Sequence, residues 1–399
     1  MELREKTEVQ QERNAGLFAD VTIQSVSTGL ISATLLIAGT ALIILEAAAY
    51  GGFTSEQTIS WMFAVYFFGG LFGVVMPLWL RIPITGGHSL TGVAFLATVT
   101  AQFTYPELIG GYVMSGLFIF FVGISGLFTK MVEWVPKEVI SAMLAGLVAS
   151  YVVRLVPSVK ELPLVGGIAL LSYFIFTRYR KRFPPALGAI VIAIITWLLT
   201  QGTFATETSQ VSFMPSVQIP EFSWLSFVTL ALPLAMLILS NDAAVGIGAL
   251  ESTGYKPPIR KIVTMSGVFS TITSLFGGQC ANIAGMMTAI CSSRDSGERA
   301  RRYTAPVVCG VVTMIFGIFA WKIVPFIQSL PQAMISMLAG FSLIGVLLAN
   351  LQFSFSAKNY SMASLTAFIV ALSNVSFLHI SAPVWALLLG ALLSRAMPK

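Results

Sequence analysis

Two short stretches that open with glycine pairs carry most of the polar side chains that this apolar sequence could use for chemistry. The first covers residues 86–91 and the second, 191 residues later, covers residues 277–282. Glycine lets the backbone approach a ligand closely, and the polar side chains that follow can direct hydrogen bonds to it. From these stretches we predict the substrate-binding residues Gly86, Gly87, His88, Ser89, Thr91, Gly278, Gln279, Cys280 and Asn282.

One acidic residue, Asp242, lies well inside an apolar segment of the second half, directly after Asn241. An ionised carboxylate at membrane depth costs several kcal/mol unless it is paired, hydrated or protonated, so a functional role is the default interpretation. We predict that Asp242 carries a coupling proton and that Asn241 belongs to the substrate site. An acid that faces a cytoplasmic vestibule is the alternative. Glu46 lies at the outer end of the first apolar segment, where access to water alone can explain it.

The elements that must position these groups are two half-length helices. Residues 84–100 and 278–291 are apolar but too short to cross a bilayer comfortably. If the two helices enter from opposite faces, their N-termini meet near the midplane, and each offers free N–H groups and a partial positive charge to an anion. A bound carboxylate would repel an ionised Asp242, so proton and anion would favour each other's binding. These features outline a proton symporter.

Composition excludes a soluble domain. The chain is 56% hydrophobic and 10% charged, with a mean hydropathy of +0.84. The net charge of +6 does not indicate a nucleic-acid partner, because the basic residues fall in short loops between apolar segments. Three cysteines give no disulfide framework or metal-ligand spacing, and we find no nucleotide-binding loop or serine elbow. We therefore predict a polytopic membrane protein that is not an enzyme and has no cofactor apart from a coupling ion, for which sodium is an alternative to the proton.

Fourteen apolar segments follow from hydropathy, seven in each half of the chain. They are 26–49, 58–80, 84–100, 107–129, 138–155, 163–177 and 184–201, then 224–249, 260–276, 278–291, 303–322, 332–350, 361–378 and 381–396. A second sequence match, between residues 136–146 and 331–340, has an offset of 194 to 195 residues and supports a duplicated chain. Because seven is odd, the two halves must be inserted in opposite orientations. The predicted fold is all-α, with 7+7 inverted repeats in which segments 3 and 10 are the half-length helices.

The distribution of positive charge gives the orientation. With a cytoplasmic N-terminus, all lysines and arginines fall on the cytoplasmic side except Arg154, Lys160 and Lys322. The N-terminal residues are polar without an apolar signal core, so we expect no cleaved targeting peptide. We predict a bacterial inner-membrane protein with both termini in the cytoplasm.

Several segments resemble the benzoate–proton symporter family. Residues 276–284, followed by 288–291 and a basic tail to residue 303, are similar to the signature of that family's tenth span. Residues up to 254–258 and residues 143–146 are similar to it as well, so the resemblance covers most of the chain at low intensity. It implies the fold of the uracil and sulfate transporters, with a core of spans 1–4 and 8–11 that moves against a gate of spans 5–7 and 12–14. Substrate would then lie between spans 3 and 10, beside spans 1 and 8.

Two positions depart from that family's pattern. Its members typically have Ser-Gln-Asn at residues 240–242, where this chain has Ser-Asn-Asp, and Trp-Ser-Thr-Pro-Gly at residues 88–92, where this chain has His-Ser-Leu-Thr-Gly. An acid in the eighth span is closer to the nucleobase transporters.

These inferences together predict a secondary active transporter that imports a small organic anion, with benzoate or a related aromatic carboxylate as the first choice, together with protons and by alternating access. The alternatives are a nucleobase–proton symporter, in which Asp242 binds ring N–H groups, and a passive anion channel. Membrane lipid and a second copy of the chain in a homodimer are the expected partners. The predicted parts are a cytoplasmic segment 1–25, core halves 26–130 and 224–322, gate halves 131–201 and 323–399, and an outer linker 202–223.

Overall fold

The computed structural model describes residues 17–132, 135–178, 185–201, 216–375, 377 and 382–396. Most of the predicted cytoplasmic segment 1–25 and most of the linker 202–223 lie outside these residues. The described chain is almost entirely helical, and its one sheet is a pair of two-residue strands. This confirms the predicted class of an all-helical membrane protein.

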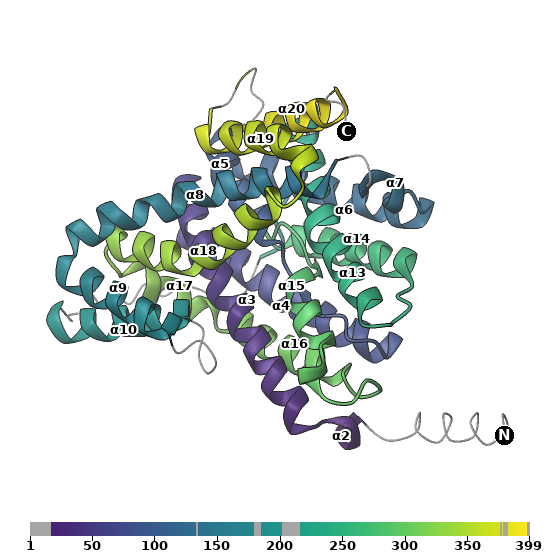
Figure 1. Cartoon of the computed structure of the whole chain (residues 1–399), viewed down its shortest axis with the longest axis horizontal. Helices are drawn as coiled ribbons and strands as arrows, with labels where there is room; N and C mark the ends of the chain where they lie inside the picture. The colour runs from purple at the N-terminus through teal and green to yellow at the C-terminus, as the bar shows by residue number, and fades with distance from the viewer. Residues whose placement is uncertain are drawn as a thin grey trace.

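Helices follow one another along the chain with short connections (Figure 1). The first half comprises α2 (Leu17–Asp20), α3 (Ile23–Tyr50), α4 (Ser55–Leu80), β1 (Gly86–Gly87), α5 (Leu90–Val99), α6 (Tyr105–Ser125), α7 (Phe128–Val132), α8 (Lys137–Glu161), α9 (Pro163–Arg178) and α10 (Pro185–Gln201). The second half begins with one long helix, Trp224–Ser252, which contains α11 (Trp224–Ser226), α12 (Leu232–Leu237) and α13 (Ala244–Ser252) joined by π-helical turns. It continues with α14 (Ile259–Leu275), β2 (Asn282–Ile283), α15 (Gly285–Ser292), α16 (Thr304–Ile318), α17 (Ala320–Gln328), α18 (Gln332–Ser354), α19 (Ser361–Ser373) and α20 (Ala382–Ala396).

Six helices of the described chain are long and apolar enough to cross a membrane, or seven if one bent pair forms a single span. The other apolar helices are shorter, so the count of fourteen spans stays a prediction. One predicted boundary is wrong. The segment 303–322 is not one straight helix, because α16 ends at Ile318 and α17 turns away by 63°. Hydropathy continues through this bend, so apolar length alone could not locate it.

The two halves repeat the same packing. Helix α14 packs against α6, and α16 packs against α4; α3 contacts α5, as α13 contacts α15. Helices α9 and α10 form a pair that matches α19 and α20, while α8 and α18 pack against each other. Helix ends repeat too, since α4 ends at Leu80 and α14 at Leu275, 195 residues later, and α8 and α18 begin at Lys137 and Gln332, again 195 apart. An internal repeat with inverted halves would produce this pattern.

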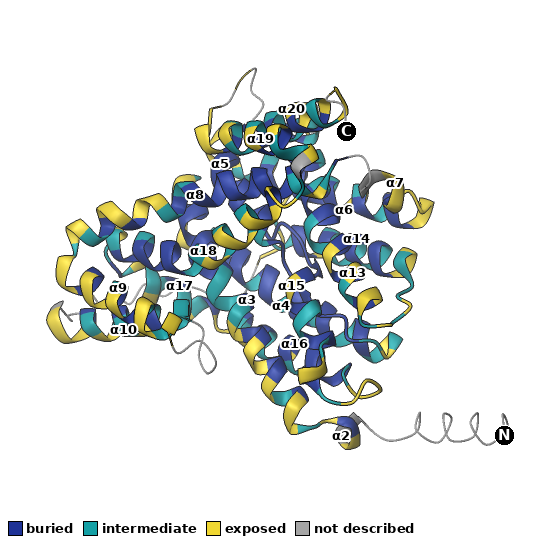
Figure 2. Cartoon of the chain, in the orientation of Figure 1, coloured by how far each residue is buried: buried dark blue, intermediate teal, exposed yellow. Residues whose placement is uncertain are grey.

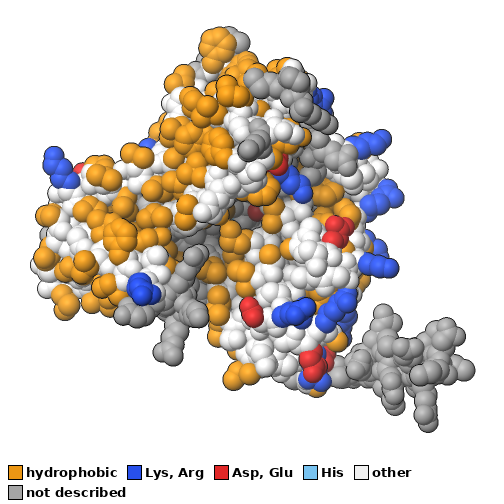
Figure 3. All heavy atoms as spheres, in the orientation of Figure 1, with side chains coloured by type: hydrophobic (Ala, Val, Ile, Leu, Met, Phe, Trp, Pro, Cys, Tyr) orange, Lys and Arg blue, Asp and Glu red, His pale blue; other side chains and the backbone are white. Residues whose placement is uncertain are grey.

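Buried residues gather at the centre of the helix bundle, and exposed apolar residues form a rim along α8, α9 and α10. Figure 2 shows buried residues concentrated around the centre of the bundle that holds α4 and α15, and exposed residues along the outer sides of α8, α9 and α10. Large apolar side chains such as Phe174 (67% exposed) and Leu199 (82% exposed) cover that rim. Figure 3 shows hydrophobic side chains over this part and Lys and Arg side chains at the opposite edge. Such an apolar surface suits contact with lipid.

The start of α3 is tied to two other helix ends by the buried carboxylate of Asp20. The hydroxyl of Tyr303 donates to Asp20 Oδ2 over 2.5 Å, and the guanidinium of Arg81 lies 3.5 Å from the same oxygen and donates to Tyr303. Arg301 Nε lies 3.9 Å from Asp20 Oδ1. This cluster joins the chain before α3 to the end of α4 and the start of α16.

Replacing Asp20 with alanine should therefore lower thermal stability. Tyr303 and Arg81 would lose their common acceptor, at a cost of roughly 1–2 kcal/mol because Arg81 remains half exposed to solvent. The melting temperature of the detergent-solubilised protein measures this. The control is Glu298→Ala, since the side chain of Glu298 is 78% exposed and forms a surface ion pair with Arg301. An equal effect of both substitutions would contradict the structural role of Asp20.

Candidate functional site

The two predicted half-length helices meet at the strand pair. Strand β1 runs antiparallel to β2, with Gly86 opposite Ile283 and Gly87 opposite Asn282. Helix α5 begins three residues after Gly87, and α15 begins two residues after Ile283. Because the strands are antiparallel, the helices leave them in opposite directions and their first turns lie near one another. The helical parts start six to seven residues later than the predicted limits 84 and 278, because the residues before them are extended.

The register between the two halves differs from the one predicted. The sequence match aligns Gly86 with Gly277 at an offset of 191, whereas the N-cap residues Ser89 and Ala284 are 195 apart, like the helix ends above. The two glycine pairs have the same sequence but different structural roles. Gly277 turns the chain after α14 with φ of +90°, while Gly86 packs its backbone against α4. His88 is therefore equivalent to Ile283 and not to Gln279.

Close packing accounts for the three predicted glycines. A Cβ atom placed on Gly86 would lie 2.2 Å from the backbone nitrogen of Gly73, which leaves no room for any side chain. Around Gly278 the neighbours are Ala64, Val65 and Thr273, and around Gly87 they are Leu36 and Ala284. These glycines let the strands lie against α4, α14 and α3.

Ser89, Cys280, Asn282 and Asp242 come together at the strand pair. The backbone N–H of Ser89 donates to Cys280 Sγ over 3.3 Å, and the Cys280 thiol lies 3.6 Å from Asn282 Oδ1 and donates to it. The carboxylate of Asp242 faces the side chains of Ser89 and Asn282. Ser89 Oγ also caps α5 at Gly92 N and lies 2.8 Å from Thr91 Oγ1. Residues from both halves of the chain thus form one polar cluster.

A π-helical turn, Ile238–Ala243, presents the acidic residue to this cluster. Such turns insert one extra residue into a helix and occur frequently at functional sites. Asn241 and Asp242 are half buried, whereas Ser89, Cys280 and Asn282 are fully buried. The two residues of the turn are therefore less buried than the rest of the predicted site, although Asn241 Nδ2 and Asp242 Oδ2 themselves are buried.

The side chains of His88 and Gln279 each contact α4. The His88 ring is edge-on to Tyr66, with 4.8 Å between ring centroids. The indole N–H of Trp61 donates to Gln279 Oε1 over 2.6 Å. Trp61 was not predicted as a site residue, and no sequence signal marks it, because its role depends on a tertiary contact 218 residues away.

Several buried polar atoms near the strand pair lack a partner in the described chain. They are both ring nitrogens of His88, Asn241 Nδ2, Asp242 Oδ2, Gln279 Nε2 and Asn282 Nδ2. Native structures satisfy the great majority of buried polar atoms, so such a group indicates a place for a ligand. Trp61 N–H can only donate, which fixes the oxygen of Gln279 toward it and leaves the amide NH₂ free. For Asn282, Oδ1 accepts from the Cys280 thiol and Nδ2 has no partner in the described chain. The free groups of these two amides are therefore hydrogen-bond donors.

Helix α15 adds backbone donors. Its N-cap is Ala284, and no side chain caps its first turn, which leaves the N–H groups of the first turn, beginning at Gly285, without intrahelical partners. These N–H groups and the helix dipole favour an anion. A neutral, donor-rich site that holds one acid can bind a carboxylate without a basic side chain.

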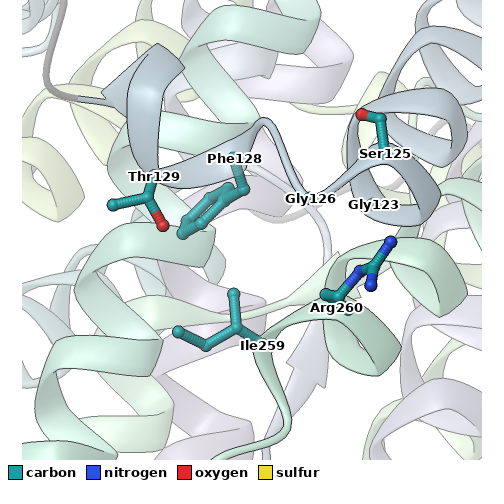
Figure 4. Close-up of a pocket in the computed structure, with 7 residues that line it drawn as sticks. All are labelled: Gly123, Ser125, Gly126, Phe128, Thr129, Ile259 and Arg260. Atoms are coloured by element: carbon teal, nitrogen blue, oxygen red, sulfur yellow. The ribbon is translucent and has the colours of Figure 1, made fainter.

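Two cavities lie near this site but do not include the strand pair. One, of about 430 Å³, is lined by residues from the end of α6, from α7 and from the start of α14 (Figure 4). The other, of about 370 Å³, is lined by Ala244, Ile247, Gly248 and Glu251 of α13 together with residues around α7 and the start of α8. The second cavity begins two residues beyond Asp242 in the sequence and follows α13 away from it, and no residue of the polar cluster lines it.

Glu46 is more deeply placed than its sequence position suggested. It is only 5% exposed, and Arg154 of α8 donates to its Oε1 over 2.5 Å. The ion pair therefore holds one carboxylate oxygen of this acid, while Oε2 is buried without a partner in the described chain. The ion pair links α3 to α8.

Known proteins resemble this chain along nearly its whole length. Residues 19–396 match the family described as benzoate membrane transport protein. A curated relative with that name from Acinetobacter baylyi (strain ATCC 33305 / BD413 / ADP1) is 26% identical over 94% of this chain and 95% of its own. The inner membrane protein YdcO of Escherichia coli (strain K12) is 27% identical over 91% and 93% of the two chains.

Solved structures share the fold. The transmembrane domain of a cyanobacterium bicarbonate transporter, BicA, superposes with a TM-score of 0.62 at 17% identity and covers 94% of this chain and 98% of that one. SLC26A9 gives a TM-score of 0.63 at 13% identity over 94% and 64% of the two chains. The resemblance predicted from residues 276–303 is confirmed, and these relatives are named as membrane proteins or transporters and not as enzymes. The chain belongs to the benzoate membrane transport protein family.

Proposed function

We propose that this protein is a secondary active transporter that carries benzoate or a related aromatic carboxylate into the cell together with a proton. The observation that supports it most is the pairing of free donors with an acid at the strand pair: Asn282 Nδ2 and the first turn of α15 lie beside Asp242. The name of the A. baylyi relative supports benzoate as the anion.

In this proposal the substrate carboxylate accepts hydrogen bonds from the amide groups of Asn282 and Gln279 and from the first N–H groups of α15. Asp242 is protonated when the anion binds, because two carboxylates side by side in a poorly hydrated site repel each other. A protonated Asp242 can itself donate a hydrogen bond. Loss of the proton on the cytoplasmic side then weakens substrate binding, so the two are released together. A sodium ion instead of a proton would need oxygen ligands, and the free amide groups here are donors.

Alternating access would move the core, formed by α3–α6 and α11–α16, against the gate, formed by α8–α10 and α18–α20. Burial along α3 supports a state closed at one end, since residues 40–48 are all buried while Leu30 and Ile31 near its start are exposed. Glu46 and Arg154 join the proposed core and gate at the buried end. The arrangement as fourteen spans in two inverted sevens is part of this proposal, as are the domain limits above. The homodimer stays a prediction from the sequence.

The orientation in the membrane is proposed from the charges. Arg81 and Arg301 lie beside Asp20, directly before α3 begins. Positive charge is enriched on the cytoplasmic side of inner-membrane proteins. We therefore assign this end, and both termini, to the cytoplasm.

Uptake by proteoliposomes tests the proposed function. Radiolabelled benzoate should accumulate under an inward proton gradient, and unlabelled benzoate should compete with it while uracil should not. Competition by uracil alone would favour the nucleobase symporter, in which the free Asp242 Oδ2 accepts a ring N–H. A passive channel would give no counterflow and no accumulation above equilibrium.

Replacing Trp61 with phenylalanine should weaken benzoate binding about threefold to tenfold. Phenylalanine keeps an aromatic ring at this buried position, but it is smaller and lacks the N–H that fixes Gln279 Oε1, so the amide can rotate and no longer presents its NH₂ reliably. Equilibrium binding of radiolabelled benzoate to purified protein measures the change. Trp79→Phe is the matched control, because Trp79 is 54% exposed. Unchanged affinity in Trp61→Phe would remove Gln279 from the substrate site.

A further inference from the structure

Partly exposed apolar side chains lie next to the polar cluster. Helix α15 sits between α3 and α13, which both pack against it (Figure 1). Met286 in the first turn of α15 is 54% exposed, and Val245, one turn after Asp242, is 43% exposed. On the α3 side Leu35 and Ala38, one turn apart, are half buried. These four side chains, Met286, Val245, Leu35 and Ala38, are here called the trough.

The trough touches the polar cluster directly. A Cβ atom placed on Gly285 would lie 2.8 Å from the carbonyl oxygen of Asp242 and 3.0 Å from Val245 Cβ, so the first turn of α15 lies against the turn that carries the acid. Met286 follows Gly285 immediately. Met286 is therefore the next residue after the first donor of α15, and Val245 lies three residues after Asp242.

The trough is also distinct from the main apolar core. Leu36, Ala284 and Met287 form a small buried cluster of their own, on which Leu35 and Ile290 pack. This buried cluster lies beneath partly exposed apolar side chains and beside hydrogen-bond donors without partners in the described chain. Small-molecule sites have this composition, since they are mostly apolar with a few placed polar groups. A ligand with a carboxylate at one end and an apolar body at the other would match both parts.

We propose that Met286 and Val245 contact the apolar body of the transported anion and determine which carboxylates the protein accepts. This inference rests on the proposed function. With the carboxylate on Asn282 and the first turn of α15, an aromatic ring would lie over Met286 and Val245. The thioether of Met286 makes favourable contacts with aromatic rings and adapts to their shape. Small carboxylates without a ring would reach the donors but not these two side chains.

The test is competition against radiolabelled benzoate in counterflow, with acetate, benzoate and 2-naphthoate as competitors. Met286→Ala and Met286→Gln should each raise the half-inhibitory concentration of benzoate about tenfold and leave that of acetate within about twofold, since only the ring loses its contact. Val245→Phe, which fills the trough, should exclude 2-naphthoate more strongly than benzoate. Met286→Gln keeps the length of the side chain at an exposed position, so the competition can still be measured with this variant if the alanine variant fails to fold. Phe121→Ala on α6 is the control, because Phe121 is 59% exposed and far along the chain from the cluster.

Selectivity that matches the wild type in all three variants would overturn the inference, and would mean that lipid or a gate helix covers the trough. An equal loss for acetate and benzoate would also overturn it, since it would assign a purely structural role. A failure of the proposed function itself would give another result: the wild-type protein would show no counterflow of benzoate, whatever the variants do.

Discussion

Replacing Asp242 with asparagine should abolish proton-driven accumulation of benzoate while exchange of benzoate across the membrane continues at a reduced rate. Asparagine has nearly the same shape and can still donate a hydrogen bond to the bound carboxylate, but it cannot bind and release a proton. With one proton carried per benzoate, a gradient of one pH unit supports roughly tenfold accumulation, because one pH unit corresponds to about 1.4 kcal/mol. The variant should reach a ratio of about one.

The measurement compares uphill uptake and counterflow in the same proteoliposomes. Glu251→Gln is the matched control, since Glu251 lies on the same helix at its exposed end and lines the cavity that follows α13. It should accumulate benzoate as the wild type does. Uphill uptake by Asp242→Asn at the wild-type level would show that another group carries the coupling ion.

Replacing Gly86 with alanine should destroy substrate binding and destabilise the protein strongly. The added Cβ would lie 2.2 Å from the nitrogen of Gly73 and 2.3 Å from the carbonyl oxygen of Gly69. Both neighbours are backbone atoms of α4, so no side-chain rotation can relieve the clash and β1 must move. Overpacking usually costs about 1–3 kcal/mol, and a contact with rigid backbone belongs at the upper end of that range. A displaced β1 would also separate the first turns of α5 and α15.

Thermal unfolding and benzoate binding of the purified variant measure the effect. Gly39→Ala is the control, because a Cβ atom at Gly39 would meet no atom within 4 Å, although this glycine also lies inside a long helix. We expect a melting temperature lowered by several degrees in Gly86→Ala and little change in Gly39→Ala. Wild-type binding by Gly86→Ala would contradict the placement of β1 at the site.

The sequence allowed the class, the family and the meeting of two short helices to be predicted. Residues 84–100 and 278–291 stood out because each is apolar, short and led by glycine, features that depend on local composition. Asp242 stood out because an acid is costly in an apolar segment. Each of these signals lies within a few residues, which is the range over which a single sequence is informative.

Other features depended on contacts between distant residues and could not be predicted. The sequence match with an offset of 191 residues paired two glycine motifs that have different roles. Residue types alone do not show that Gly86 packs on α4 while Gly277 forms a turn. The bond from Trp61 to Gln279 and the ion pair of Glu46 with Arg154 join residues 218 and 108 positions apart. The bend between α16 and α17 leaves hydropathy unchanged. The contribution of Met286 appears only when its exposure beside Asp242 is known.

The central claim is that the anion binds where α5 and α15 begin, and a cryo-EM structure with bound benzoate tests it most directly. The account predicts density for the carboxylate within about 3 Å of Asn282 Nδ2 and of the first N–H groups of α15, a hydrogen-bonding distance. Density for benzoate in the cavity lined by Gly126 and Arg260 instead, with the strand pair empty, would contradict it.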